Sequence, residues 1–153
     1  MSDVPEAGYR ERLGVPLRWW VQGTMLVATL WLALIVAVPG PAAWGVTGLA
    51  LLALAVAMRG YGGAVVEVRD GELRAGRAHI AAAHLGVAEA LDAGETKRVA
   101  GVDADARAFL LLRPYLRRAV RVEITDPADP APYWLLGSRR PDDLAAAIHE
   151  LRR

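Results

Sequence analysis

The feature that most constrains this chain is a stretch of forty residues without a charged side chain. From Trp19 to Met58 the sequence contains no Asp, Glu, Lys, Arg or His. A core helix of a soluble domain is shorter than this, whereas two membrane crossings together need about 40 predominantly apolar residues. The stretch therefore predicts a pair of transmembrane helices.

The two predicted spans are residues 17–38 and 42–58, which together form a transmembrane helical hairpin over residues 17–59. The first span would rise about 33 Å as a helix, and this length matches a hydrocarbon core of roughly 30 Å. The sequence "VPGP" at 38–41 interrupts the helix between the spans. A secretory signal peptide is disfavoured because the first apolar stretch is too long and a second follows at once. A buried helical pair in a soluble protein is disfavoured by the length of the segments.

The positions of the arginines predict the orientation of the hairpin. Four arginines flank its terminal side, and the turn between the helices has none: Arg10, Arg12, Arg18 and Arg59. By the positive-inside rule, both termini lie in the cytoplasm and the protein is a two-span protein of the cytoplasmic membrane. Residues 1–16 are then an N-terminal cytoplasmic segment. Within it, Tyr9 to Leu13 form either a short interfacial helix near lipid phosphate or only a topology signal.

Residues 60–153 show the alternating pattern of short strands. "AVVEVRDGELRAG" has a strong hairpin signal at Asp70-Gly71. "AHIAAAHL", "AFLLL", "RAVRVEIT" and "YWLLGS" predict further strands, and "GVAEALDAGETKRVAG" predicts one or two short helical turns. Residues 141–152 predict a final helix, with Pro141 in its first turn and acidic residues at its positive end. The fold class is therefore an α+β membrane protein: a helical hairpin followed by a small antiparallel β barrel and a C-terminal helix.

The order of these elements is that of a pleckstrin-homology-like domain, in which a C-terminal helix plugs an open end of the barrel. The segments "YRERLGVP" at 9–16, "RAFLLLRPY" at 107–115 and "PYWLLGSRRP" at 132–141 carry a further resemblance, together with the Trp-rich hairpin and the final helix. The chain resembles an actinobacterial family of small membrane proteins catalogued only as a domain of unknown function. The resemblance implies the architecture and supplies no activity, substrate or catalytic residue.

Several kinds of chemistry find no support in the sequence. Cysteine is absent, and His79 and His84 fall on opposite faces of a strand, so no metal or cofactor site is predicted. Ser138 lacks the motif of a catalytic serine, and we expect it to cap backbone N–H groups before the last helix. No catalytic residue and no enzymatic activity is predicted. Residues 61–153 carry fourteen charges of each sign, a balance that argues against nucleic-acid binding.

The candidate binding residues lie in the arginine-rich stretch "RAFLLLRPYLRRAVRVEI" at 107–124. Strand alternation places Val120, Val122 and Ile124 toward the core, with Arg117 and Arg121 on a plain outward face. Arg113 and Arg118 flank the Pro114-Tyr115 connection, where guanidinium groups could hold a phosphate or an acidic segment. The speculative binding set, which includes residues of both groups, is Arg107, Arg113, Tyr115, Arg117 and Arg118.

These observations predict a membrane-anchored interaction or scaffold module that displays a cytosolic β domain. Its expected partners are the lipid bilayer and either a protein or an anionic lipid headgroup, and small residues on the helices also allow a homo-oligomer. Two alternatives stay open. The protein could be an accessory subunit of a larger membrane complex, or an enzyme acting on lipid or cell-envelope precursors.

Overall fold

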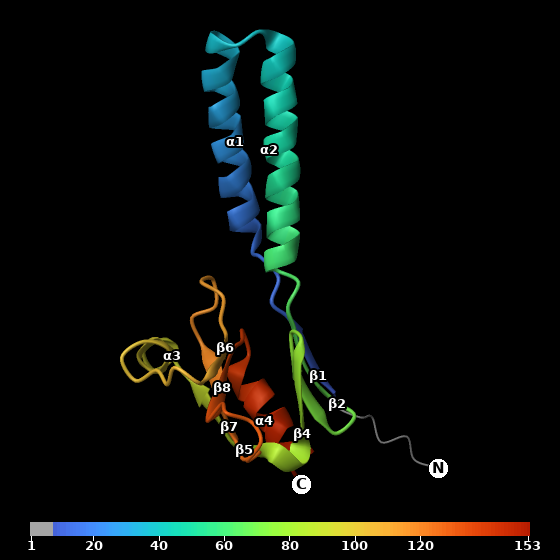
Figure 1. Cartoon of the computed structure of the whole chain (residues 1–153), viewed down its shortest axis with the longest axis vertical. Helices are drawn as coiled ribbons and strands as arrows, with labels where there is room; N and C mark the ends of the chain where they lie inside the picture. The colour runs from blue at the N-terminus through green and yellow to red at the C-terminus, as the bar shows by residue number, and fades with distance from the viewer. Residues whose placement is uncertain (1–7) are drawn as a thin grey trace. The chain divides into compact units, whose positions relative to one another are not determined.

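The computed structural model describes residues 8–153, which form two compact units (Figure 1). The helical unit comprises residues 14–63. The other unit, here called the β unit, comprises residues 8–13 together with 64–153. Residues 8–13 thus join the β unit, whereas the sequence predicts a separate segment over 1–16. Residues 1–7 of that segment lie outside the described residues.

The helical unit consists of α1 (Leu17–Ala37) and α2 (Gly40–Tyr61), which pack against each other as a hairpin (Figure 1). Both helices are long and apolar enough to span a membrane, as the sequence predicts. The second helix begins earlier than predicted because Gly40 and Pro41 form its first turn, where a proline needs no hydrogen-bonded N–H. Leu54 of α2 packs over Gly23 of α1, since a Cβ on Gly23 would lie 2.8 Å from Leu54 Cδ1 and would displace that side chain.

Sheet A of the β unit is antiparallel, with strand order β1-β2-β3-β4. Its strands are β1 (Tyr9–Arg12), β2 (Val65–Arg69), β3 (Glu72–Ala75) and β4 (Ala78–Ala81). The predicted hairpin turn at Asp70-Gly71 is confirmed: both residues have positive φ angles, 54° and 78°, as a tight hairpin turn between antiparallel strands requires.

Strand β1 corrects the sequence-based interpretation of Tyr9 to Leu13 as a short interfacial helix. Tyr9 and Glu11 are buried while Arg10 and Arg12 are exposed, and this period of two belongs to a strand. The strand pairs with β2 in a register that places Arg12 opposite Val65. Because α1 and α2 lie between these two strands in the sequence, the helical hairpin is an insertion between neighbouring strands of one sheet.

Sheet B has the order β5-β7-β8-β6. A short 3-10 turn, η1 (Ala82–His84), leads into β5 (Leu85–Leu91); the other strands are β6 (Phe109–Leu111), β7 (Ala119–Ile124) and β8 (Tyr133–Gly137). Two predictions fail here. Residues 86–91 form a strand, and helical structure starts only at α3 (Ala93–Ala100), where Asp92 accepts the N–H groups of Gly94 and Glu95. Strand β6 pairs with β8 in parallel, so the predicted all-antiparallel barrel is wrong at this edge.

The C-terminal helix α4 (Pro141–Leu151) confirms the predicted final helix. It buries Leu144 and Ile148 completely and contacts β5, β7, β2 and β1. Residues of both sheets join this helix in one core, which includes Val66, Leu73 and Val122. The structure therefore has two open sheets that share a core with α4 (Figure 1).

The other face of sheet B is less exposed than the alternation in the sequence predicts. Ala119, Tyr133 and Leu135 form a second buried cluster, against which Val99 and Ala100 of α3 pack. The guanidinium of Arg121 lies 4.7 Å from the centre of the Tyr133 ring. Arg121 therefore covers an aromatic side chain in addition to facing water, which corrects its assignment to a plain outward face.

Candidate functional site

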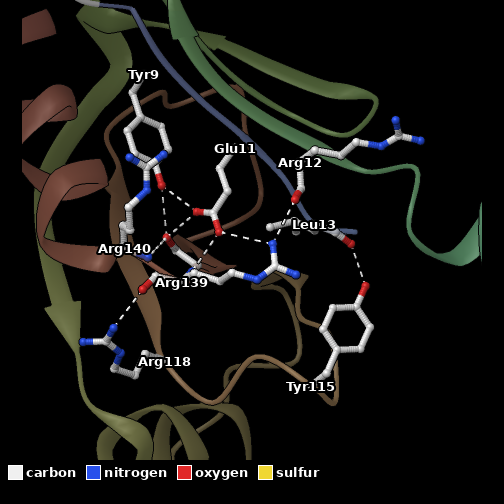
Figure 2. A network of polar contacts seen from close by, with 9 residues as sticks. Tyr9, Glu11, Arg12, Leu13, Tyr115, Arg118, Arg139 and Arg140 are labelled. Carbon is white, nitrogen blue, oxygen red and sulfur yellow. Dashed lines mark hydrogen bonds and ion pairs between the residues drawn. The ribbon is translucent and has the colours of Figure 1, made fainter. Parts of the chain in front are cut away.

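A buried carboxylate organises the polar contacts of the β unit (Figure 2). Glu11 is only 6% exposed. Its Oε2 accepts hydrogen bonds from Tyr9 Oη at 2.5 Å and Ser138 Oγ at 2.6 Å, and its Oε1 accepts one from the backbone N–H of Arg139 at 2.9 Å. We call Tyr9, Glu11, Ser138 and Arg139 the Glu11 junction. It connects β1 to the segment between β8 and α4, more than a hundred residues along the chain.

Additional contacts extend the Glu11 junction to two neighbouring segments (Figure 2). Ser138 Oγ accepts the backbone N–H of Arg140 at 2.9 Å, so this hydroxyl serves a backbone N–H just before α4, close to its predicted role. Arg139 Nη1 donates to the carbonyl of Arg12 at 3.0 Å, and Tyr115 Oη donates to the carbonyl of Leu13 at 2.6 Å. The first residues of the β unit are therefore held at successive points along their backbone.

Three exposed guanidinium groups surround this junction, and we call Arg118, Arg139 and Arg140 the arginine surface (Figure 2). Arg118 Nη2 donates to the carbonyl of Arg139 at 2.8 Å. The guanidinium of Arg140 lies 5.3 Å from the centre of the Tyr9 ring and 3.8 Å from Asp143 Oδ2. A guanidinium carries five N–H donors, so Arg118 and Arg140 have donors beyond these contacts.

The junction shifts the pKa values of its two acidic groups. Burial alone would raise the pKa of the Glu11 carboxyl, but hydrogen bonds from Ser138, Tyr9 and the Arg139 backbone, with the nearby Arg139 charge, lower it below 4.5. Burial, together with the hydrogen bond to the Glu11 carboxylate, raises the pKa of Tyr9 to about 12. The junction is therefore built around an ionised Glu11 and a neutral Tyr9.

These shifts predict that the stability of the β unit falls on both sides of neutrality. Because the folded pKa of Glu11 lies below its ordinary 4.5, its stabilisation is complete above that pH and is lost as the pH falls through the folded value. Because the folded pKa of Tyr9 is raised, its stabilisation is complete below pH 10 and is lost between pH 10 and about 12. Thermal unfolding measured across pH should show that stability falls less at acid pH in Glu11→Gln than in wild type. It should fall less at alkaline pH in Tyr9→Phe. Unchanged declines would contradict the assignment.

The structure distributes the five predicted binding residues over several places. Arg118 contacts the Glu11 junction through the Arg139 carbonyl, Tyr115 contacts the carbonyl of Leu13 just after β1, and Arg117 is exposed beside Arg118 in the chain. Arg113 is partly buried, and its Nη1 donates to the carbonyl of Leu112. Arg107 lies elsewhere: its Nε and Nη2 donate to the two carboxylate oxygens of Asp105, each at 3.2 Å, ahead of β6. Ligand binding by these residues stays a prediction.

The residue that sequence reasoning missed is Glu11. The signal was present, since Tyr9, Glu11 and Leu13 alternate with two arginines in the manner of a strand. Its partner strand, however, follows only after the helical hairpin. Arg139 and Arg140 were likewise absent from the predicted set because nothing in the local sequence links them to Arg118.

No group of three or more His, Asp or Glu side chains that could hold a metal ion occurs within residues 8–153. The comparison with known families gives a match over residues 8–148 to a family described as "Protein of unknown function (DUF3093)". The chain belongs to this family. The match to DUF3093 covers the helical unit and nearly all of the β unit, and the family has no established function. No curated protein and no solved structure matches the chain.

Proposed function

We propose that this DUF3093 protein is a membrane-anchored, non-catalytic interaction module whose β unit binds anionic lipid headgroups through the arginine surface. In this proposal the two helices cross the cytoplasmic membrane and both termini are cytoplasmic. The observation that carries it is the insertion of the apolar hairpin between the paired strands β1 and β2. The anchor and the β unit are connected at two adjacent points of one sheet.

The two connections are short. Residues 13–16 join β1 to α1, and residues 62–64 join α2 to β2. Even when fully extended, linkers of this length reach at most roughly 20 Å. If the helices span a bilayer, the ends of β1 and β2 that join the helices stay within about this distance of the membrane surface. Cations of the β unit near these ends then meet a high local concentration of lipid phosphate.

The chemistry of the arginine surface suits such a ligand. The side chains of Arg139 and Arg140 are 45% and 57% exposed. The backbone N–H groups of Arg139 and Arg140 are held by Glu11 and Ser138, and the Arg118 carbonyl accepts the backbone N–H of Ser138 at 3.0 Å. Guanidinium groups bind phosphate oxygens through two parallel N–H donors, and a positioned arginine loses less conformational entropy on binding.

The orientation of the chain in the membrane and the structural relationship of the β unit are part of the same proposal. Arginines on the terminal side of the hairpin and none in its turn support cytoplasmic termini. A shared core between two sheets and a C-terminal helix supports a pleckstrin-homology-like relationship, although the parallel β6–β8 pair departs from an antiparallel barrel. An actinobacterial origin is part of the proposal through the resemblance noted in the sequence.

The proposal predicts selective retention of anionic lipid by the arginine surface. The full chain is reconstituted in lipid nanodiscs that contain equal amounts of phosphatidylglycerol and phosphatidylcholine. It is then released gently from the discs for native mass spectrometry. We expect wild type to retain phosphatidylglycerol preferentially, and the variant Arg118→Ala with Arg140→Ala to lose most of that preference, because each charge-assisted contact contributes roughly 1.5–3 kcal/mol at most.

The matched control replaces two other exposed arginines of the β unit, Arg98→Ala with Arg152→Ala, which carry the same loss of charge. It should retain the wild-type preference. Equal loss in both double variants would indicate a general effect of net charge. No preference in wild type would refute headgroup binding, and a protein retained in place of lipid would favour a protein partner.

A further inference from the structure

An open cleft lies between the two strands that end the sheets. Strand β4 is the last strand of sheet A and β6 is the last strand of sheet B. The turn between β3 and β4 lies beside β6, since a Cβ on Gly76 would lie 4.0 Å from Leu111 Cδ1. A cleft of about 510 Å³ is lined by this turn, by β4 and by the start of β6. This volume lies within the range of small-molecule sites in proteins, about 300–1,000 Å³.

The cleft has an aromatic floor. Phe109 of β6 and Trp134 of β8 line it with their rings 4.9 Å apart and inclined by 50°. Trp134 is only 4% exposed and belongs to the core, while Phe109 is partly buried. Ala78, Ala108 and Ala131 complete the apolar lining. Small side chains around two rings leave space for an apolar group of a ligand.

Polar side chains line the rim of the same cleft: Arg77, His79, Arg107 and Asp129. Arg107 is neutralised by Asp105, and Asp129 Oδ1 accepts the backbone N–H of Ala131 at 2.8 Å within its turn. The side chains of Arg77 and His79 are exposed and have no hydrogen-bond or ion-pair partner among residues 8–153. The rim therefore offers one unpaired guanidinium and one imidazole, beside further N–H donors of Arg107.

We propose that this cleft binds an anionic amphiphile, a molecule in which a carboxylate or phosphate is attached to an apolar chain or ring. The apolar part lies on Phe109 and Trp134, and the acid group is held by Arg77 with support from His79 and Arg107. Such a site is separate from the arginine surface, because β2 and β3 lie between β1 and β4 in sheet A. It does not depend on headgroup binding there.

Equilibrium dialysis of the full chain in phosphatidylcholine discs tests this proposal. The probes are octanoate, octyl phosphate and octanol, with empty discs as background. We expect saturable binding of about one octanoate or octyl phosphate per chain, and weaker binding of octanol. Arg77→Ala should weaken binding of both anions by about fivefold, because one exposed charge-assisted contact is lost. Binding of octanol should stay unchanged. Arg98→Ala is the matched control and should bind like wild type.

A second variant, Ala78→Trp, places a large side chain in the cleft beside Phe109 and Trp134 and should abolish binding of all three probes. Arg77 is in an exposed turn, so its variant keeps the test valid even if Ala78→Trp folds poorly. Binding no greater than to empty discs would overturn the proposal. Equal affinity for octanol and octanoate, both insensitive to Arg77→Ala, would overturn the assignment of an anionic ligand.

The acid can reach the cleft either from the membrane or from water, and a labelling experiment distinguishes these two sources. A photoreactive fatty acid is either incorporated into the discs or added in solution below its partitioning limit. Trypsin then releases residues 108–117 as one peptide, because the Arg113-Pro114 bond resists cleavage. Labelling of this peptide from the bilayer arm indicates a lipid source, and labelling only from solution indicates a soluble ligand. Absence of label on it in both arms would contradict the site.

Discussion

Replacing Glu11 with alanine is expected to lower the free energy of unfolding of the β unit by about 3 kcal/mol, because removing one partner of a buried charged network leaves the others uncompensated. Three donors, the Tyr9 and Ser138 hydroxyls and the Arg139 backbone N–H, lose their acceptor. The two hydroxyls lie 3.1 Å apart, so one can donate to the other. The hydrogen of the accepting hydroxyl and the Arg139 backbone N–H are then left without an acceptor.

Thermal unfolding of the full chain, with hydrogen exchange of the peptide that contains β1, measures this effect. Glu11→Gln should lower the free energy of unfolding by about half as much. The amide oxygen of glutamine still accepts a hydrogen bond, but its NH₂ group faces other donors. The matched control is Glu150→Ala on α4, an exposed carboxylate whose loss should change stability by less than about 0.5 kcal/mol. A loss below about 1 kcal/mol for Glu11→Ala would mean that the ladder with β2 is sufficient to hold β1.

Replacing Gly86 with alanine should be the second most damaging change, at a cost of about 2 kcal/mol or more. The register between β5 and β7 shifts between Leu85 and Ala88, so Gly86 and Val87 together face Glu123 in a β-bulge. A Cβ on Gly86 would lie 2.7 Å from Glu123 Cβ and 3.1 Å from the Glu123 carbonyl oxygen. The two strands must separate to admit it.

Gly94→Ala is the matched control for this change. Its added Cβ would meet only Asp92 Oδ1 at 3.4 Å, an ordinary contact, and alanine favours the helix α3. Gly94→Ala should therefore be neutral or slightly stabilising in the same unfolding experiment. If the two variants were equally stable, the close approach of β5 and β7 at Gly86 would be wrong.

Local signals predicted the elements that depend on neighbouring residues. The apolar helices follow from the absence of charge, the β2–β3 turn from Asp70-Gly71, and the start of α4 from Pro141. Boundaries were less accurate where two local signals competed. The helix formers of residues 86–91 belong to a strand, because pairing with β7 outweighs their weak intrinsic preference.

Features that depend on distant partners were not predictable from local patterns. The strand character of Tyr9 to Arg12 requires β2, which follows only after the helical hairpin. The parallel pairing of β6 with β8 requires knowing that β7 lies between β5 and β8. The candidate site shows the same limit, since Tyr115 and Arg118 were identified without Glu11, the carboxylate of the junction that they extend.

The insertion of the helices between β1 and β2 has a consequence for the order of folding. During synthesis β1 leaves the ribosome first, yet its ladder partner begins at Val65, after both helices. Its side-chain partner Ser138 follows later still, 127 residues after Glu11. Contacts of such sequence separation form late, because their loop-closure entropy is lost before they become favourable. The first strand of the β unit therefore stays unpaired until the helices and β2 have been synthesised. The Glu11 junction closes only after Ser138 and Arg139 have been synthesised as well.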